Sequence, residues 1–317
     1  MKKRTQQGFT LVELLVAMAL AMVIMAAIFK TFKSQQDSYI IQDQVVAMQQ
    51  NLRGAMYVLT KDLQLAGHGV NFDRNQRTLN WDDRGATEAA RPLIYAGDNV
   101  SETGILSGTD TLTIVKANRD FWRELTPGES ATAGTGSSAV ISLANRCLDS
   151  GNTTPDLNDS TKKYGLLIKN DLRAADFFEV NSASGDINPP GGLTNNYTAG
   201  DIITRADIVI YRVNSSGDLV RKNLGNDLGY QTIAENIDNL QFSYVLNSGS
   251  ETNNPNTNPG LVRAVKVFML GRTAHTHRGF KDPDTYTMAN ASVSPGDGYR
   301  RKLMCSTVKT RNIGLTE

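Results

Sequence analysis

Gly8-Phe9-Thr10-Leu11-Val12-Glu13-Leu14-Leu15 is the stretch that decides how this chain is built. It follows a short basic leader, residues 1–8, and opens an apolar run without a charged residue from Leu14 to Phe29. A helix needs about 20 apolar residues to cross the hydrocarbon core of a membrane. The run therefore predicts a membrane-spanning helix over residues 9–29, and the positive charges ahead of it place its N-terminal end in the cytoplasm.

Glu13 is the one charge inside this predicted span. A carboxylate at membrane depth costs roughly 2.5–3.5 kcal/mol on insertion scales, so such a residue is expected to have a partner and a function. An ordinary secretory signal is the alternative interpretation, since Ala17-Met18-Ala19 has the spacing of a signal peptidase site. That site lies inside the apolar run rather than after it, which favours a helix that is retained.

The quoted stretch resembles the class III signal of type IV pilins and of type II secretion pseudopilins. The resemblance implies that a prepilin peptidase cuts between Gly8 and Phe9 and that the new amino group of Phe9 is then methylated. It also implies that the Glu13 carboxylate meets the Phe9 amine of a neighbouring subunit in the filament, which would supply the partner that membrane energetics demand.

The helical pattern continues beyond the membrane. Apolar residues recur at steps of three or four, which predicts one long helix over residues 9–66 whose second half is amphipathic and covers the remaining chain. Gly67 is expected to end the helix as a glycine C-cap. A coiled-coil dimer is the alternative use of the stripe. Its residues are Ile41, Val45, Met48, Leu52, Met56, Leu59, Leu63 and Ala66.

Residues 67–317 read as a β-rich head, because short β-branched runs alternate there with Gly, Asn, Asp, Ser and Pro clusters. The fold class is therefore α+β, with one long N-terminal helix ahead of a sheet-rich domain. Residues 207–221 predict a β-hairpin. The predicted strands are residues 111–116, 139–143, 166–168, 177–180, 208–213, 219–221, 240–245, 262–270 and 303–311.

The order of elements in residues 200–313, including the basic ending from Arg300 to Asn312, resembles PilW-type minor pilins and the related J-type pseudopilin. Major pilins usually carry a helix-breaking proline where this chain has Lys30, which favours a minor component. We expect a minor pilin that helps to initiate assembly at or near the pilus tip. Its expected partners are the prepilin peptidase, other minor pilins, the major pilin and a tip adhesin. The alternatives are a pseudopilin of type II secretion and a membrane-tethered adhesin.

The resemblance implies a protein held by one helix in the inner membrane before assembly and later found at the cell surface. Outside the cytosol, Cys147 and Cys305 are able to form a disulfide, which the chain-entropy model values at on the order of 5 kcal/mol for so long a loop. Two unrelated buried thiols are the alternative.

The sequence gives little support for catalysis, nucleic-acid binding or metal binding. No catalytic motif is present, so neither an enzyme nor a cofactor is expected. The net charge of +1, with acidic and basic residues interspersed, predicts no nucleic-acid binding. The weak candidates for a metal site are His275 with His277, and the Asx-rich turn that contains Asp156 and Asp159.

Overall fold

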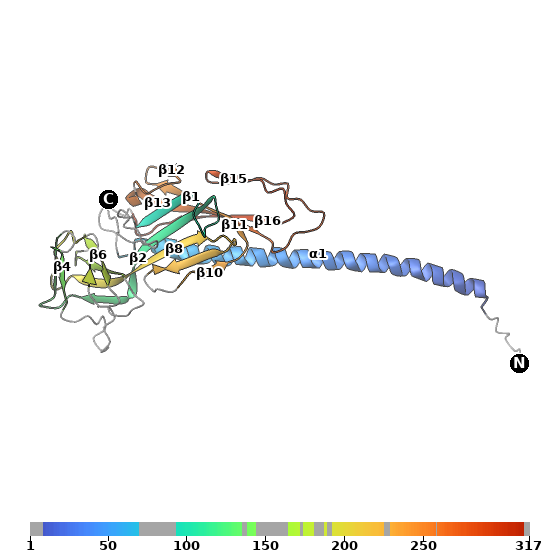
Figure 1. Ribbon diagram of the computed structural model, residues 1–317, viewed down its shortest axis with the longest axis horizontal. Helices are drawn as coiled ribbons and strands as arrows, with labels where there is room; N and C mark the ends of the chain where they lie inside the picture. Colours follow the sequence, from blue (N-terminus) through green and yellow to red (C-terminus); the bar gives the residue numbers. More distant parts are fainter. Residues whose placement is uncertain are drawn as a thin grey trace, which may run out of the picture. The chain divides into compact units, whose positions relative to one another are not determined.

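Figure 1 shows the structure, a computed structural model that describes residues 9–69, 93–134, 138–143, 164–171, 174–180, 187–188, 192–224, 229–257 and 259–313. The chain divides into two compact units, Met1–Ala47 and Met48–Glu317. The first holds the N-terminal part of one long helix. The second holds the rest of that helix and all the strands.

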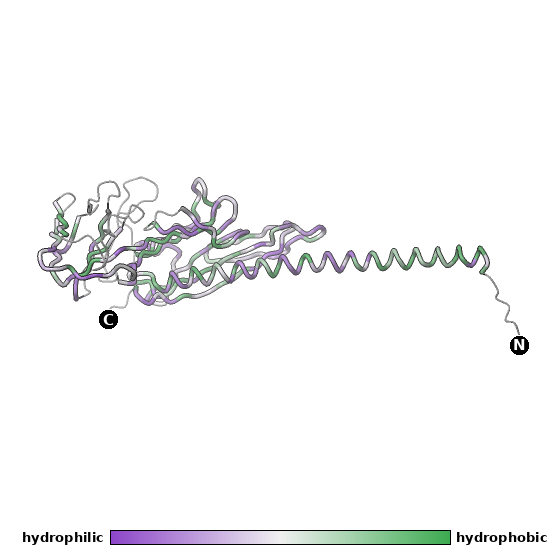
Figure 2. The backbone as a smooth tube through the Cα atoms, turned by 90° about the horizontal axis from the view of Figure 1, so that it is seen from below, coloured by the Kyte–Doolittle hydropathy of each residue, from purple (hydrophilic) through white to green (hydrophobic). Residues whose placement is uncertain are grey.

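The helix α1 runs from Leu11 to Leu65, within two residues of the bounds predicted from the sequence. It contains no proline, and its first part is rich in Ala, Leu and Met, which are strong helix formers. In the first unit the apolar side chains from Leu11 to Phe32 are exposed, and Figure 2 colours much of that part of the backbone tube green, for hydrophobic residues. By length and composition this helix is able to cross a membrane.

From Met48 onward the apolar stripe of α1 is buried in the second unit, as the amphipathic pattern predicted. Leu52, Leu59 and Leu63 have no exposed surface. Gly271 on the strand β13 (Val262–Arg272) makes room for Leu52, since a Cβ at that position would lie 2.9 Å from the Leu52 Cδ2 atom. The second half of the helix therefore covers a sheet of its own chain.

Gly67 ends the helix in a left-handed conformation with φ of 72°, which confirms the predicted C-cap. Its N–H donates to the Val115 carbonyl at 2.8 Å, and the Asn312 amide donates to the Gln64 carbonyl at 3.3 Å. A Cβ at Gly67 would lie 2.8 Å from Ile313. The C-terminal residues of the domain are thus packed against the end of α1.

The strands form antiparallel sheets, which confirms the expected α+β class. The larger sheet has the order β1-β2-β8-β5-β6-β7, with β9 beside β8 and β10 beside β9, and the smaller has the order β12-β11-β13-β16. Two further pairs, β3-β4 and β14-β15, stand apart. The bounds are β1 Ile94–Val100, β2 Thr109–Glu124, β3 Ser130–Thr132, β4 Val140–Ser142, β5 Tyr164–Ile168, β6 Ala175–Val180, β7 Ile187–Asn188, β8 Ile202–Val213, β9 Leu219–Asn223, β10 Gln231–Ala234, β11 Ile237–Leu246, β12 Glu251–Thr252, β13 Val262–Arg272, β14 Tyr286–Met288, β15 Ala291–Val293 and β16 Arg301–Lys309, with one short 3-10 helix at Pro259–Leu261.

Each predicted strand overlaps an observed one, and the predicted hairpin is formed by β8 and β9, where Val213 faces Leu219. Several strands are longer than their apolar runs indicated. β2 continues through the polar residues after Lys116 because it remains paired with β8 across a register shift between Asn118 and Trp122. The strands β1, β3, β7, β10, β12, β14 and β15 were not predicted, since they are short or interrupted by polar residues and by glycine.

Part of the core lies where α1 packs on the sheets, and two further clusters, around Ile208 and around Phe178, contain no residue of α1. Tyr211 on β8, and Phe242 and Tyr244 on β11, are among the largest fully buried side chains. β11 also contacts β2 and β1, so the smaller sheet packs on the larger one. This packing brings polar residues from distant parts of the chain into the interior.

Candidate assembly sites

The helix N-terminus is a capping box made by Thr10 and Glu13. The Glu13 carboxylate accepts hydrogen bonds from the Thr10 backbone N–H at 3.0 Å and from the Thr10 hydroxyl at 3.1 Å. In return, the Glu13 N–H donates to the Thr10 hydroxyl oxygen at 3.3 Å. These bonds satisfy N–H groups that a helix start leaves unpaired, and a negative charge is favoured at that end of the helix dipole. Glu13 therefore has a partner within its own chain.

This local partner was not predicted, although Thr10-Leu11-Val12-Glu13 has the T-x-x-E spacing of a capping box. The pairing of Glu13 with the Phe9 amine of a neighbour is a separate, intermolecular contact and stays a prediction. Phe9 itself is exposed. Gly8 lies outside the described residues.

Asp62 is a buried carboxylate on the sheet-facing side of α1. It accepts hydrogen bonds from Tyr211 at 2.6 Å, Lys116 at 2.8 Å and Arg221 at 2.9 Å. These three partners lie on β8, β2 and β9 respectively. One carboxylate of the helix therefore joins three neighbouring strands of the larger sheet.

Burial raises the pKa of Asp62, but the charge and hydrogen bond of Lys116 and the hydrogen bonds of Tyr211 and Arg221 together outweigh it, so the pKa is lowered. Burial and the nearby Asp62 charge raise the pKa of Tyr211. The carboxylate is thus charged and the phenol neutral at physiological pH. A cavity of about 670 Å³ opens beside this group, lined by helix residues such as Tyr57 and by Lys116 and Arg221. Lys116 and Arg221 are already paired with Asp62, so we interpret these residues as a contact that holds α1 on the sheet.

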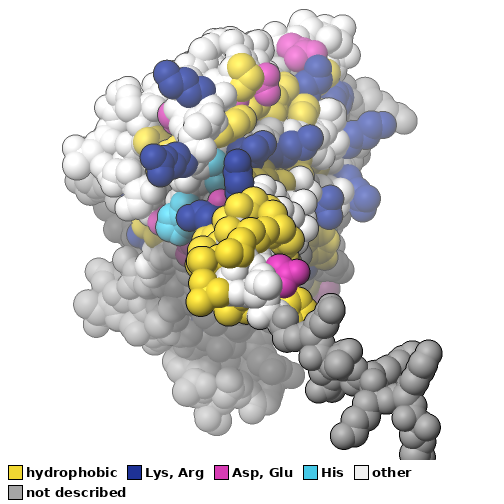
Figure 3. Space-filling view, turned by 90° about the vertical axis from the view of Figure 1, so that its right-hand side faces the viewer, with side chains coloured by type: hydrophobic (Ala, Val, Ile, Leu, Met, Phe, Trp, Pro, Cys, Tyr) yellow, Lys and Arg dark blue, Asp and Glu magenta, His cyan; other side chains and the backbone are white. Residues whose placement is uncertain are grey.

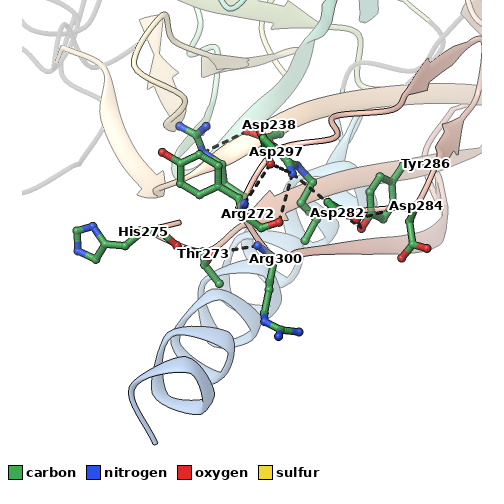
Figure 4. A network of polar contacts seen from close by, with 11 residues as sticks. Asp238, Arg272, Thr273, His275, Asp282, Asp284, Tyr286, Asp297 and Arg300 are labelled. Atoms are coloured by element: carbon green, nitrogen blue, oxygen red, sulfur yellow. Dashed lines mark hydrogen bonds and ion pairs between the residues drawn. The ribbon is translucent and has the colours of Figure 1, made fainter. Parts of the chain in front are cut away.

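Arg301 on β16 is the centre of a second polar cluster, shown in Figure 4. Its side chain is 3% exposed and contacts Asp238, Asp282 and Asp297. Two nitrogens bind the Asp297 carboxylate at 2.6 and 2.7 Å, and Nε reaches Asp238 at 2.5 Å. Burial lowers the pKa of Arg301, but the three carboxylates outweigh it, so the pKa is raised. This cluster ties the long connection between β13 and β16 to β11.

Asp110 on β2 is a third buried carboxylate and connects the two sheets. Its oxygens accept the backbone N–H of Phe242 on β11 at 2.8 Å and that of Asn99 on β1 at 2.9 Å. Burial raises its pKa to about 6, with a further contribution from Asp98. The neighbouring Tyr244 hydroxyl is fully buried and has no hydrogen-bond partner among the described residues. Asp110 therefore connects the two sheets, and its contribution to the free energy of unfolding depends on pH.

The weak metal candidates find no support in the described part of the chain. His275 and His277 lie in the irregular segment after β13, not in a strand, and Figure 4 shows His275 pointing away from Asp282. The described residues contain no group of three or more His, Cys, Asp or Glu side chains able to hold a metal. Burial, with a smaller effect of Arg300, lowers the pKa of His277. Asp156 and Asp159 lie outside the described residues.

Cys305 lies on β16 and is exposed, and it is not bridged to any described residue. Cys147 lies outside the described residues. The predicted disulfide between them therefore stays a prediction.

Comparisons with known proteins match two parts of the chain. Residues 3–29 match the prokaryotic N-terminal methylation motif, and residues 209–312 match the family Type IV Pilus-assembly protein W. Among solved structures, a type IV-like pilin from Thermus thermophilus aligns with 83% of this chain and 97% of its own. Its sequence identity is 11% and the TM-score is 0.36. Comparison with curated proteins returns no significant match.

The methylation motif and the apolar helix that it opens define a type IV pilin-like protein, anchored in the inner membrane by a single helix before pilus assembly. Such a motif implies processing by a prepilin peptidase and assembly with other pilins. Within this class, the second match shows that residues 209–312 are similar to the PilW family of pilus-assembly proteins. Proteins of this family are structural rather than enzymatic. The two resemblances expected from the sequence are therefore confirmed.

Proposed function

We propose that this minor pilin helps to initiate type IV pilus assembly and lies at or near the pilus tip. The observation that carries the proposal is the combination of the match to the PilW family over residues 209–312 with an apolar helix that continues unbroken through Lys30. An uninterrupted helix suits a subunit that enters the filament in few copies. An abundant subunit would be expected to carry the proline that softens the helix.

In this proposal a prepilin peptidase removes residues 1–8, and the amino group of Phe9 is methylated. The apolar side chains of the first unit, which are exposed in the isolated chain, then pack against the helices of other minor pilins and of the major pilin. Burying apolar side chains of this size contributes roughly 1.5–3 kcal/mol each in water. Within a membrane that contribution is smaller, and close packing of the helices takes its place.

The Glu13 carboxylate would pair with the Phe9 amine of a neighbour once two subunits meet. Because both charges are poorly solvated there, the pair would fix the axial register of one helix against the next. The PilW domain would remain outside the membrane and contact a tip adhesin. The cleavage and the methylation are carried out by the prepilin peptidase, and no residue of this chain is required to catalyse a reaction in this mechanism.

Deletion of the gene followed by complementation tests the proposal. We expect the deletion strain to assemble far fewer pili, counted by electron microscopy and by the major pilin released on shearing. Complementation should restore both, and the protein should be found at the filament end by gold labelling. Normal piliation in the deletion strain would contradict the initiating role. Normal piliation together with a defect in protein secretion would favour the pseudopilin alternative.

A second measurement tests processing separately. Co-expression with a prepilin peptidase should yield a chain whose mass has lost residues 1–8 and gained one methyl group on Phe9. A Gly8→Val variant should remain uncut and stay in the membrane fraction, while a matched Gly54→Ala variant in the exposed part of α1 should be processed normally. Cleavage at another bond would contradict the assignment of Gly8 and Phe9.

A further inference from the structure

The outer edge of β16 is unusual among the sheet edges of the domain. β16 is the last strand of the smaller sheet, and it keeps an unbroken register with β13 over nine residue pairs, from Arg301 opposite Arg272 to Lys309 opposite Ala264. The opposite edge of the same sheet is β12, which has two residues. The larger sheet ends in the two-residue β7 and in β1 and β10, whose pairings contain register shifts.

Short strands and bulges are devices by which proteins blunt exposed sheet edges. β16 uses neither, and it contains no proline. No strand of the described part of the chain pairs with its outer side. A long, regular strand is therefore left with a row of backbone groups that an added strand is able to use.

Two hydrogen bonds at the ends of the strand pair show which backbone groups face outward. The Thr310 N–H donates to the Arg263 carbonyl at 3.0 Å, and the Thr273 N–H donates to the Arg300 carbonyl at 2.9 Å. In an antiparallel pair, hydrogen-bonded residues alternate with non-bonded ones. Because the register does not shift in between, even-numbered residues of β16 bond to β13. The N–H and C=O groups of Leu303, Cys305 and Thr307 point to the outer edge.

The charge along this edge is entirely basic. Lys302, Lys309 and Arg311 are exposed, and no acidic residue occurs from Gly298 to Thr316. Arg301 is neutralised by its three aspartates and adds nothing to the edge. Figure 3 shows Lys and Arg side chains gathered on one face of the domain. An added strand would therefore meet positive charge at both ends of β16.

This charge pattern favours some strands over others as the strand that adds to β16. A second copy of β16 would bring only basic side chains near one another in either orientation, because this segment contains no acidic residue. Like charges directly opposite each other across a strand pair are destabilising. An acidic strand would gain from the same lysines, so the edge repels copies of this chain and favours a partner of opposite charge.

We propose that the outer edge of β16 is a docking edge for an extended acidic segment of a partner protein, which adds to the smaller sheet as a further strand. The backbone groups of Leu303, Cys305 and Thr307 provide the hydrogen bonds. Lys302 and Lys309 provide the selection for acidic side chains. The interaction does not depend on the proposed place in the pilus, because it uses only the folded PilW-containing unit.

The test uses the full chain in detergent micelles and a labelled peptide as long as β16, with two adjacent glutamates at each end and valines between them, so that acidic side chains lie on both faces of the added strand. Binding is followed by fluorescence anisotropy, and backbone hydrogen exchange is followed over residues 301–311. We expect the peptide to bind and to slow exchange in that segment. A matched peptide with lysine in place of each glutamate should not bind. Failure of the acidic peptide to bind or to slow exchange would overturn the proposal.

Two pairs of variants separate strand addition from simple charge attraction. Thr307→Pro removes an outward N–H at an exposed position, whereas Thr307→Val keeps it. We expect binding to weaken at least roughly tenfold with proline and to be unchanged with valine. Lys309→Glu should weaken binding, whereas Lys61→Glu, exposed on α1, should not. Thermal unfolding by circular dichroism confirms that each variant is folded. Full binding by a folded Thr307→Pro variant would overturn the proposal.

Discussion

The Thr10 backbone N–H donates a hydrogen bond of 3.0 Å to the Glu13 carboxylate, so this charge is held at the start of its own helix. Glu13 caps α1 within the chain, and we propose that it also pairs with the Phe9 amine of a neighbouring subunit. The two are separable because glutamine is able to cap a helix but carries no charge.

Glu13→Gln should keep the helix start but lose the pairing between subunits. We therefore expect Glu13→Gln and Glu13→Ala to impair incorporation into pili to a similar degree, measured as the fraction of this protein recovered in sheared filaments. Processing at Gly8 should remain largely intact in both. Thr10→Val, which removes the capping hydroxyl but no charge, is the control and should be incorporated nearly normally. Normal incorporation of Glu13→Gln would show that the charge is dispensable.

Asp62→Asn should destabilise the second unit strongly. The substitution removes the carboxylate that neutralises Lys116 and Arg221, both of which are largely buried. Breaking a buried ion pair by removing one partner costs about 3–5 kcal/mol. The free energy of unfolding, measured by urea titration in detergent, should fall by that amount. Asp43→Asn, at an exposed position of the same helix, should change it little, and equal effects of the two would contradict the importance of burial.

Asp110 should make the domain less stable as the pH rises from about 4 to 6. Its folded pKa of about 6 lies above the ordinary value of 3.8, so the folded state holds the proton more tightly than the unfolded state. The lost stability is about 3 kcal/mol, from roughly two pKa units at 1.36 kcal/mol each. Urea titrations across this pH range should show the decline in the wild type and a flatter profile in Asp110→Asn.

The pH dependence below this range should have the opposite sign. The pKa values of Asp62 and Asp297 are lowered, so the stability that they contribute is present above their ordinary pKa and is lost as the pH falls through the folded value. Parallel profiles for the wild type and Asp110→Asn between pH 4 and 6 would assign the decline to other groups.

Arg301→Met should destabilise the domain although the side-chain length is nearly kept. Asp238, Asp282 and Asp297 would be left close together without the cation that they share, and we expect a loss of about 3–5 kcal/mol. Limited proteolysis should then cut the connection between β13 and β16 faster. Lys302→Met, one residue further along and exposed, is the matched control. Similar stabilities of the two variants would contradict the role of the cluster.

Much of the fold was predicted from patterns of residues that are close together in the sequence. The apolar run, the three-to-four spacing of the stripe and Gly67 predicted α1 to within two residues, because helix formation and termination depend on neighbours in sequence. The hairpin of β8 and β9 was predicted for the same reason. Strands such as β1 and β10 escaped prediction, because their pairing with partners and not their own apolar pattern makes them strands.

The candidate sites likewise divide into those made of contiguous residues, which were predicted, and those made of distant residues, which were not. The motif around Gly8, Phe9 and Glu13 is contiguous, so the sequence by itself determined the membrane helix, the class of protein and the expected processing. Asp62 could have been noticed as a charge on the buried stripe, four residues before Ala66, but its partners Lys116, Tyr211 and Arg221 could not. Only the tertiary structure brought these residues together, gathered three aspartates around Arg301 and left the outer side of β16 without a partner strand from the described part of the chain. Ion pairs and sheet edges depend on how distant segments pack, and no local pattern records that.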